Sequence, residues 1–225
     1  TKLTKLIKYY SLINHNLIFN NKSINRYKQK QPNIQKDKAQ NLKKLSEEIK
    51  NIKNCMLKES ASNLVFSDGN PNSKVMIIGE GPGANEDKEG LPFVGRAGQL
   101  LDKMLNAINL NREKVYITNV VNYRPPENRK PKEEEVEKYL PYLKRHIEIV
   151  KPKIILLLGS TAMNAILGET DVISKMRGKW HEFEINKLKI YSLVSFHPAY
   201  LLRQPDQKKY SWIDLKMIRE KLKSL

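Results

Sequence analysis

The stretch KVMIIGEGPG (residues 74–83) decides the fold prediction. Its first half is continuously apolar and ends in a glycine-rich turn, as is typical of a strand that is buried on both faces of a parallel sheet. Three further apolar runs have the same character, at Val115–Val121, Lys153–Gly159 and Leu188–Phe196. The sequence therefore predicts four parallel strands.

The segments between these strands have apolar residues at helical spacing, most clearly over Gly95–Leu110 and Lys132–Val150. A shorter helix is expected from Ser160 to about Gly168, and a last one over Ser211–Leu222. Strands that alternate with helices predict an α/β fold, here a three-layer α/β/α sandwich around a central four-stranded parallel sheet.

In open sheets of this kind the ligand binds beyond the carboxyl ends of the strands. Four segments follow the predicted strand ends: Gly79–Phe93, Asn119–Arg129, Ser160–Met163 and Phe196–Arg203. Any functional site is expected where they meet.

The chain divides by composition into a segment at residues 1–40 and a folded domain at residues 41–225. The first segment is rich in Lys and Asn, has no Gly and shows no clean period, so we expect a poorly ordered basic tail. An organelle-targeting segment is the alternative, because the stretch is basic and poor in acids. Apolar spacing from Asn41 predicts that the domain begins with a helix that ends near Cys55.

The protein has 225 residues, with 41 Lys and Arg against 24 Asp and Glu, a net charge of +17. Eight Lys and one Arg against Asp37 place part of this charge in residues 1–40, and the remainder of the chain is still basic. Proteins this basic tend to bind polyanions, so a nucleic acid is the expected partner. A solvated surface that keeps the protein soluble is the alternative.

Composition also excludes several classes of protein. No stretch approaches 18 consecutive apolar residues, so no membrane-spanning segment or membrane partner is expected. Cys55 is the only cysteine, which excludes an intramolecular disulfide and fits a reducing compartment. For a protein that binds nucleic acid, we expect a cytoplasmic, nucleoid-associated location. No heptad pattern is present, so we expect a monomer.

Polar side chains stand out at the predicted strand ends. Asn119 lies inside an apolar strand, where an amide must be hydrogen-bonded, and its donor and acceptor suit the edge of a nucleobase. His197 opens the loop after the fourth strand, and Glu80 and Glu86 lie in or near the glycine-rich turn. The alternatives are an internal structural amide, a structural histidine, and acids that begin a helix or cap a turn.

Three motifs in order carry a family resemblance: GEGPGANEDKEGLPFVGRAGQLLDKML (residues 79–105), VYITNVVNYRPPENRKP (residues 115–131) and SFHPAYLLR (residues 195–203). Together they resemble the family 4 uracil-DNA glycosylases, and Arg177-Gly178-Lys179-Trp180 is similar to that family as well. The resemblance covers roughly residues 42–225. It implies an enzyme that rotates uracil out of DNA, hydrolyses its N-glycosidic bond and leaves an abasic site.

The resemblance also implies a role for individual residues. Phe93 would stack on the extruded uracil, Asn119 would bind its polar edge, and His197 would donate to a uracil carbonyl as negative charge develops there. Glu86 would help to shape base selection. Glu80 is the candidate to orient water or to stabilise the sugar cation, and Gly81 stands where better-known relatives have a catalytic Asp, so electrostatic stabilisation is expected to dominate.

DNA contacts are expected from the same motifs. The backbone at Gly83 would approach a phosphate closely, and Arg124 and Arg129 flank a Pro-Pro loop from which they could hold phosphates. Leu201 would fill the gap left in the base stack while Arg203 contacts the DNA backbone. Surface arginines and an ordinary buried helix face are the alternatives.

The sequence departs from the family at its metal centre. Family 4 members usually hold a [4Fe-4S] cluster on four cysteines, and the motifs place those positions at Ile52, Cys55, Tyr123 and Tyr139. Such a cluster needs thiolate ligands, so we predict that this chain has no cluster, no other metal and no other cofactor, with Tyr123 and Tyr139 filling the space by aromatic packing.

The expected function is therefore DNA base-excision repair by a uracil-DNA glycosylase. Two alternatives remain open at this level: a catalytically weak or inactive relative that binds DNA or uracil, and a glycosylase for another deaminated base. The choice between single-stranded and double-stranded DNA is not decided by the sequence, because basic grooves suit both.

Overall fold

The computed structural model describes residues 1–2, 4–5, 8–9 and 34–225. The prediction of a poorly ordered tail falls mostly on residues outside this description. Gln35–Leu225 form one compact unit. Its first helix, α2 (Ile34–Lys50), begins before the boundary expected at Asn41 and ends before Cys55.

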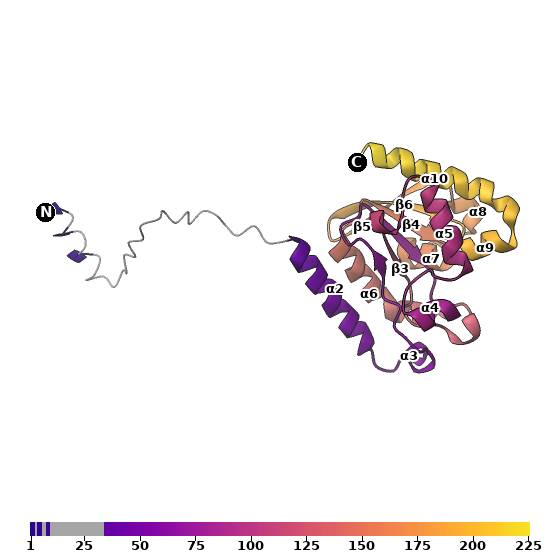
Figure 1. Cartoon of the computed structure of the whole chain (residues 1–225), viewed down its shortest axis with the longest axis horizontal. Helices are drawn as coiled ribbons and strands as arrows, with labels where there is room; N and C mark the ends of the chain where they lie inside the picture. The colour runs from indigo at the N-terminus through magenta and orange to yellow at the C-terminus, as the bar shows by residue number, and fades with distance from the viewer. Residues whose placement is uncertain (3, 6–7, 10–33) are drawn as a thin grey trace. The chain divides into compact units, whose positions relative to one another are not determined.

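In the described part of the chain, six strands form one mixed sheet, which lies among the helices drawn in Figure 1. Their order is β1-β3-β2-β4-β6-β5. The central four, β3, β2, β4 and β6, are parallel, as expected. The prediction of a four-stranded sheet was incomplete, because β1 and β5 add antiparallel strands at the two edges. The strands are β1 (Asp68–Gly69), β2 (Val75–Gly79), β3 (Val115–Asn119), β4 (Ile154–Leu158), β5 (Trp180–Ile185) and β6 (Leu188–Ser195).

The two additional strands lack the apolar run that marks the central ones. Strand β1 has only two residues. Strand β5 reads WHEFEI, an alternating pattern typical of a half-exposed antiparallel strand, and none of its residues is buried. Asn186 and Lys187, both at positive φ, connect it to β6 in a two-residue hairpin.

Helices cover both faces of the sheet, so the three-layer prediction is confirmed. Apolar side chains of α2, α6 (Glu133–Val150) and α7 (Ser160–Leu167) pack with Met76, Ile78 and Leu157 on one face. Helices α5 (Arg96–Asn106) and α10 (Lys208–Lys223) pack with Ile77 and Leu156 on the other. Neighbouring residues of one strand thus face opposite layers, which is why the central strands are apolar throughout.

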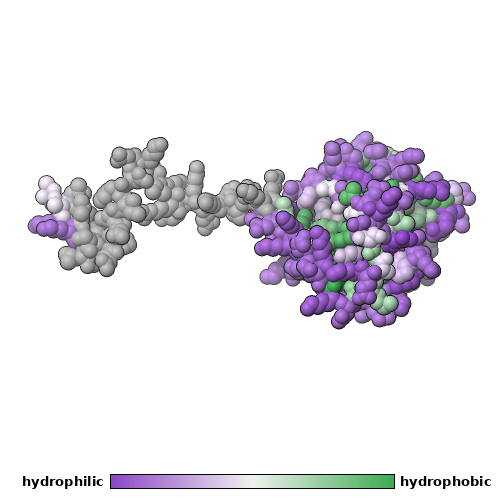
Figure 2. Space-filling model, turned by 60° about the horizontal axis from the view of Figure 1, so that its bottom comes forward, coloured by the Kyte–Doolittle hydropathy of each residue, from purple (hydrophilic) through white to green (hydrophobic). Residues whose placement is uncertain are grey.

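Short helices occupy the connections. They are α3 (Met56–Ser60), α4 (Ala84–Glu89), α8 (Ile173–Met176), α9 (Pro198–Arg203) and the 3₁₀ turns η1 (Arg112–Lys114), η2 (Pro126–Asn128) and η3 (Pro205–Gln207). Within the described residues, none of the helices combines the length and the apolar character that a bilayer crossing requires. The face in Figure 2 is mostly hydrophilic, with smaller apolar patches, in keeping with the high charge.

The sheet register brings the strand ends together. Gly79 pairs with Asn119 across β2 and β3, and Leu158 pairs with Ser195 across β4 and β6. The residues that follow these pairs therefore emerge along one edge of the sheet, which positions the site described next.

Candidate active site

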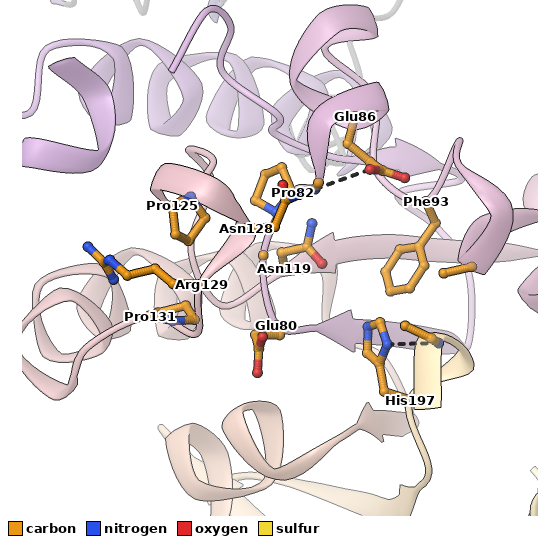
Figure 3. Close-up of a pocket in the computed structure, with 14 residues that line it drawn as sticks. Glu80, Pro82, Glu86, Phe93, Asn119, Pro125, Asn128, Arg129, Pro131 and His197 are labelled. Carbon is orange, nitrogen blue, oxygen red and sulfur yellow. Dashed lines mark hydrogen bonds between the residues drawn. The ribbon is translucent and has the colours of Figure 1, made fainter. Parts of the chain in front are cut away.

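A cavity of about 190 Å³ lies at the carboxyl edge of the sheet (Figure 3). We call it the sheet-edge pocket. Its lining comes from the loops after β2 and β3, the start of α5 and the start of α9. The lining residues are Glu80, Gly81, Pro82, Gly83, Glu86, Phe93, Ala97, Asn119, Pro125, Asn128, Arg129, Pro131, His197 and Ala199. Every residue expected to be catalytic or to bind uracil is among them.

Glycine at position 79 lets two of these side chains approach each other. A Cβ atom there would collide with Oδ1 of Asn119 and would lie 2.5 Å from Cζ of Phe93. Any larger residue would therefore fill the back of the pocket. Phe93 itself is buried and has a φ of 56°, a conformation that non-glycine residues rarely adopt.

The Asn119 amide is buried, yet it is not saturated. Its side chain is held at the end of β3, 3% exposed, and no donor in the described part of the chain reaches Oδ1. An unpaired buried acceptor costs about 1–3 kcal/mol. Figure 3 shows that this oxygen points into the space beside Phe93 and His197. Such an acceptor is suited to a ligand that donates a hydrogen bond.

His197 has a defined tautomer and charge. The backbone N–H of Ala199 donates to its Nδ1 at 3.2 Å, so the neutral ring carries its proton on Nε2. The pKa of His197 is lowered to about 4, chiefly by burial and in addition by the charge of Arg203, while the charge of Glu86 acts in the opposite direction. The ring is therefore a neutral donor at pH 7. Its centroid lies 5.6 Å from that of Phe93.

Glu80 is held by a residue that the sequence analysis did not single out. Thr161, buried in the first turn of α7, donates a short hydrogen bond from Oγ1 to Oε2 of Glu80. The segment Ser160–Met163 was expected at this edge, but the contact depends on how α7 packs against the loop after β2. Glu80 faces both the sheet-edge pocket and a larger groove beside it.

Glu86 connects two loops of the pocket. Its Oε2 accepts from the backbone N–H of Gly83 at 3.1 Å, and its Oε1 accepts from that of Gly95 at 2.8 Å. The first bond caps α4, as the turn-capping alternative anticipated. The second joins the glycine-rich turn to the turn that carries Phe93.

The residues expected to contact DNA differ in where they lie and in whether their donors are already used within the protein. Gly83 and Arg129 line the pocket, but Arg129 makes two hydrogen bonds to Glu135, at 2.8 and 2.6 Å, which occupy its guanidinium. Arg124 donates to Asn128 at 2.8 Å. Asn128, another pocket residue that the sequence analysis missed, follows a Pro-Pro pair and offered no periodic signal.

The groove beside the pocket has a volume of about 1040 Å³ and shares Glu80 and His197 with it. Exposed Arg203 lies along this groove, where a DNA backbone could pass. Leu201, expected to enter the base stack, is only 1% exposed because it lies on the buried side of α9. Its neighbour Leu202 is 37% exposed.

The four positions at which cluster cysteines were expected are all buried, and we call them the Cys55 region: Ile52, Cys55, Tyr123 and Tyr139. Sγ of Cys55 and Oη of Tyr139 lie 3.2 Å apart, within hydrogen-bonding distance. Burial and the bond to Cys55 raise the pKa of Tyr139 above its ordinary range. One thiol, one aliphatic side chain and two neutral phenols do not fit an iron-sulfur cluster, which requires thiolate ligands.

No other part of the described chain offers a metal site: nowhere in it do three His, Cys, Asp or Glu side chains come together in a suitable arrangement. Tyr123 and Tyr139, at two of the four positions where cluster cysteines were expected, both lie in the core that α2 and α6 help to form.

Comparison with known proteins places the chain among the uracil-DNA glycosylases. Residues 66–218 match the profile of the Uracil DNA glycosylase superfamily. The type-4 uracil-DNA glycosylase of Sulfurisphaera tokodaii is 44% identical over 184 residues, which cover 80% of this chain and 84% of that protein. The type-4 uracil-DNA glycosylase of Saccharolobus solfataricus is 40% identical over 189 residues, with 82% and 88% covered.

More distant similarity extends beyond this type. A type-5 uracil-DNA glycosylase of Pyrobaculum aerophilum is 32% identical over 149 residues, which cover 58% of this chain and 63% of that protein. The residues 66–218 that match the superfamily profile include all six strands of the sheet.

Proposed function

We infer that this chain, which belongs to the uracil-DNA glycosylase superfamily, excises uracil from DNA by hydrolysing its N-glycosidic bond, a reaction of base-excision repair that leaves an abasic site. The observation that carries this function to particular residues is the unpaired Oδ1 of Asn119 in a pocket that also presents Phe93 and a neutral His197. A base within a duplex is out of reach, so the uracil must first be rotated out, at a cost of a few kcal/mol.

Base recognition is assigned to Asn119 and Phe93. Uracil carries a proton on N3, which can donate to Oδ1 of Asn119, while Nδ2 of the same amide donates to the O4 carbonyl. Cytosine has an unprotonated N3 and an amino group at C4. Its N3 acceptor would therefore face the Oδ1 acceptor of Asn119, and its amino donor would face the Nδ2 donor, so neither hydrogen bond could form. Phe93 supplies an aromatic face for stacking, and Gly79 leaves the room that both side chains need.

Leaving-group stabilisation is assigned to His197. As the bond breaks, negative charge develops on uracil and is shared by its carbonyl at C2. The proton on Nε2 of His197 is available for a hydrogen bond to this oxygen, because Ala199 already occupies Nδ1. Removal of such a donor typically lowers the rate by roughly 10²–10³-fold.

Stabilisation of the sugar is assigned to Glu80. The deoxyribose becomes cationic in the transition state, and a nearby carboxylate favours that charge. The bond from Thr161 fixes one oxygen of Glu80 and leaves the other for the sugar or for the attacking water. Gly81 and Glu86 are assigned to the shape of the same loop. Neither side chain donates a hydrogen bond to the base, because Gly81 has no side chain and both oxygens of Glu86 accept from backbone N–H groups.

DNA is expected to enter over the groove beside the pocket. Arg203 is assigned to a phosphate, with Arg124 and Arg129 as outer contacts. The backbone N–H of Gly83, first expected to approach a phosphate, already donates to Glu86. The exposed side chain of Leu202 suits the role first expected of Leu201, because it can reach an opened base stack without unfolding of α9. One chain supplies all these groups, and we propose that the protein acts as a monomer.

We also propose that the enzyme works without an iron-sulfur cluster, because the Cys55 region offers one thiol where four thiolates are needed. Iron and acid-labile sulfide are measured in anaerobically purified protein. Less than about 0.1 iron per chain is expected; a [4Fe-4S] cluster contains four irons, so a content near that value would refute the proposal.

The function is tested with a labelled oligonucleotide that contains one uracil, with a thymine-containing strand as the control. Alkali then cleaves at abasic sites. Strand scission at uracil alone is the expected result. Tight binding without scission would instead identify a binding protein, and scission only at other deaminated bases would identify a different glycosylase.

A further inference from the structure

The turn that carries Phe93 is held from outside the pocket by one arginine. Arg112, in η1 before β3, donates from Nη1 to the carbonyl of Pro92 at 3.1 Å and from Nη2, in a short bond, to the carbonyl of Phe93. No charge of the pocket contacts this guanidinium, and the mechanism above does not use it. Arg112 is not among the residues that line the sheet-edge pocket.

Arg112 is itself fixed by two carboxylates. Nη1 lies 2.7 Å from Oδ2 of Asp68 in β1, and Nε lies 2.9 Å from Oδ1 of Asp102 in α5. The guanidinium therefore joins three elements, and its donors form a planar fork that a lysine cannot reproduce. These ion pairs are partly exposed, with 25% of the Arg112 side chain accessible, so their chief effect is orientation rather than stability.

The held turn is a strained one. Phe93 has a positive φ, and a Cβ atom at Gly98 would collide with the Phe93 carbonyl, so α5 packs directly against this peptide. A residue keeps such a conformation only when its surroundings over-determine it. Arg112 holds the carbonyl side of the turn, and Glu86 holds the N–H of Gly95 on its far side.

We propose that Arg112 is a positioning residue for uracil excision: it fixes the strained Phe93 turn so that the ring is ready to stack on the extruded base. This inference rests on the stacking role given to Phe93 under the proposed function. Without the guanidinium, both carbonyls lose their donor, and the turn relaxes toward negative φ with the ring displaced from the pocket.

A double-mutant cycle tests this with kcat/KM for the uracil oligonucleotide, measured well below each melting temperature. Phe93→Ala is expected to lower kcat/KM about 10–100-fold, the range of base–aromatic stacking. Arg112→Lys keeps the positive charge but loses the planar set of guanidinium donors. It is expected to lower kcat/KM about 10-fold, because misplacement of a group that contacts the substrate slows the reaction. In the double variant the loss should match that of Phe93→Ala within about two-fold, because the anchored ring is absent.

Two further measurements separate positioning from general support. Affinity of Arg112→Lys for abasic product DNA should stay within about two-fold of wild type, because no base remains to stack. Arg145→Lys is the matched control: it also replaces an arginine that pairs with a carboxylate, here Glu48, but it does not line the pocket, and it should retain full activity. If Arg112→Lys does not fold, Arg112→Gln, whose amide can still donate to one carbonyl, replaces it in the cycle.

The outcomes are distinguishable. Losses that multiply in the double variant, or Arg145→Lys as impaired as Arg112→Lys, would overturn the positioning role and leave the proposed function intact. Full activity of Phe93→Ala would instead remove the stacking role of Phe93, and with it this inference.

Discussion

The sheet-edge pocket and the Cys55 region differ in whether their buried polar atoms have hydrogen-bond partners. In the pocket, Asn119 keeps a buried oxygen without a donor, and His197 keeps a free N–H. In the Cys55 region, the thiol of Cys55 and the hydroxyl of Tyr139 lie in hydrogen-bonding distance of each other. The first arrangement is complete only when a ligand binds, whereas the second is complete as it stands. A binding site is recognised here by the hydrogen bonds that it has yet to make.

The largest expected effect comes from removal of the unpaired amide. Asn119→Ala should lower kcat/KM for uracil-containing DNA by roughly 10²–10³-fold, because both hydrogen bonds to the base are lost. Salt-dependent affinity for DNA should persist, since phosphate contacts lie elsewhere. Single-turnover kinetics and binding titrations measure the two quantities.

Asn122 provides a matched control for this variant. It is also a buried amide, three residues after Asn119, and its Nδ2 donates to the carbonyl of Val65 at 3.0 Å. Asn122→Ala should lower stability while kcat/KM of the folded protein is retained. Equal losses of activity in both variants would mean that Asn119 acts only as a structural amide.

A smaller effect is expected at Thr161. Thr161→Val removes the bond to Glu80 with little change in volume, and should lower kcat about 10-fold, because a hydrogen bond to a charged group is worth roughly 1.5–3 kcal/mol. Thr161→Ser should restore most of the rate. If the serine variant is as slow as the valine variant, packing rather than the hydrogen bond is responsible.

In the Cys55 region, Tyr139→Phe should leave kcat/KM unchanged. The free energy of unfolding should fall by about 1 kcal/mol, the usual worth of a neutral hydrogen bond, because Cys55 loses its partner. Urea denaturation with an unchanged m-value measures this. A fall in excision rate with no change in stability would connect this region to the pocket and erase the contrast between them.

The smallest effect concerns pH. Because the pKa of His197 is lowered to about 4, the ring stays neutral from pH 8 down to pH 6, and its contribution to kcat/KM should be constant over that range. Activity should fall only near pH 4, where protonation of Nδ1 displaces the N–H of Ala199. Histidine NMR signals followed against pH measure the pKa; a midpoint near the ordinary 6.5 would contradict the neutral donor.

The sequence allowed the parallel core and the pocket to be predicted for one physical reason: strands buried on both faces are continuously apolar, and their carboxyl ends converge. Glu80, Asn119 and His197 follow three such strands and meet as expected. Strand β5 was missed because its pattern alternates at an exposed edge.

Other features depended on tertiary contacts that no local pattern carries. Arg112 lies in a short 3₁₀ turn, and its importance is visible only through carbonyls about 20 positions earlier. Thr161 reaches Glu80 across the sheet edge. The burial of Leu201 likewise follows from the packing of α9 against α5, which the motif alone does not specify.

The most direct measurement is a crystal structure with DNA that carries a 2′-fluorinated deoxyuridine, whose N-glycosidic bond resists cleavage. The account predicts uracil outside the helix and in the sheet-edge pocket, stacked on Phe93, with N3 within about 3 Å of Oδ1 of Asn119 and the O2 carbonyl at a similar distance from Nε2 of His197. A uracil that remains stacked in the DNA, or one that binds away from these three side chains, would contradict it.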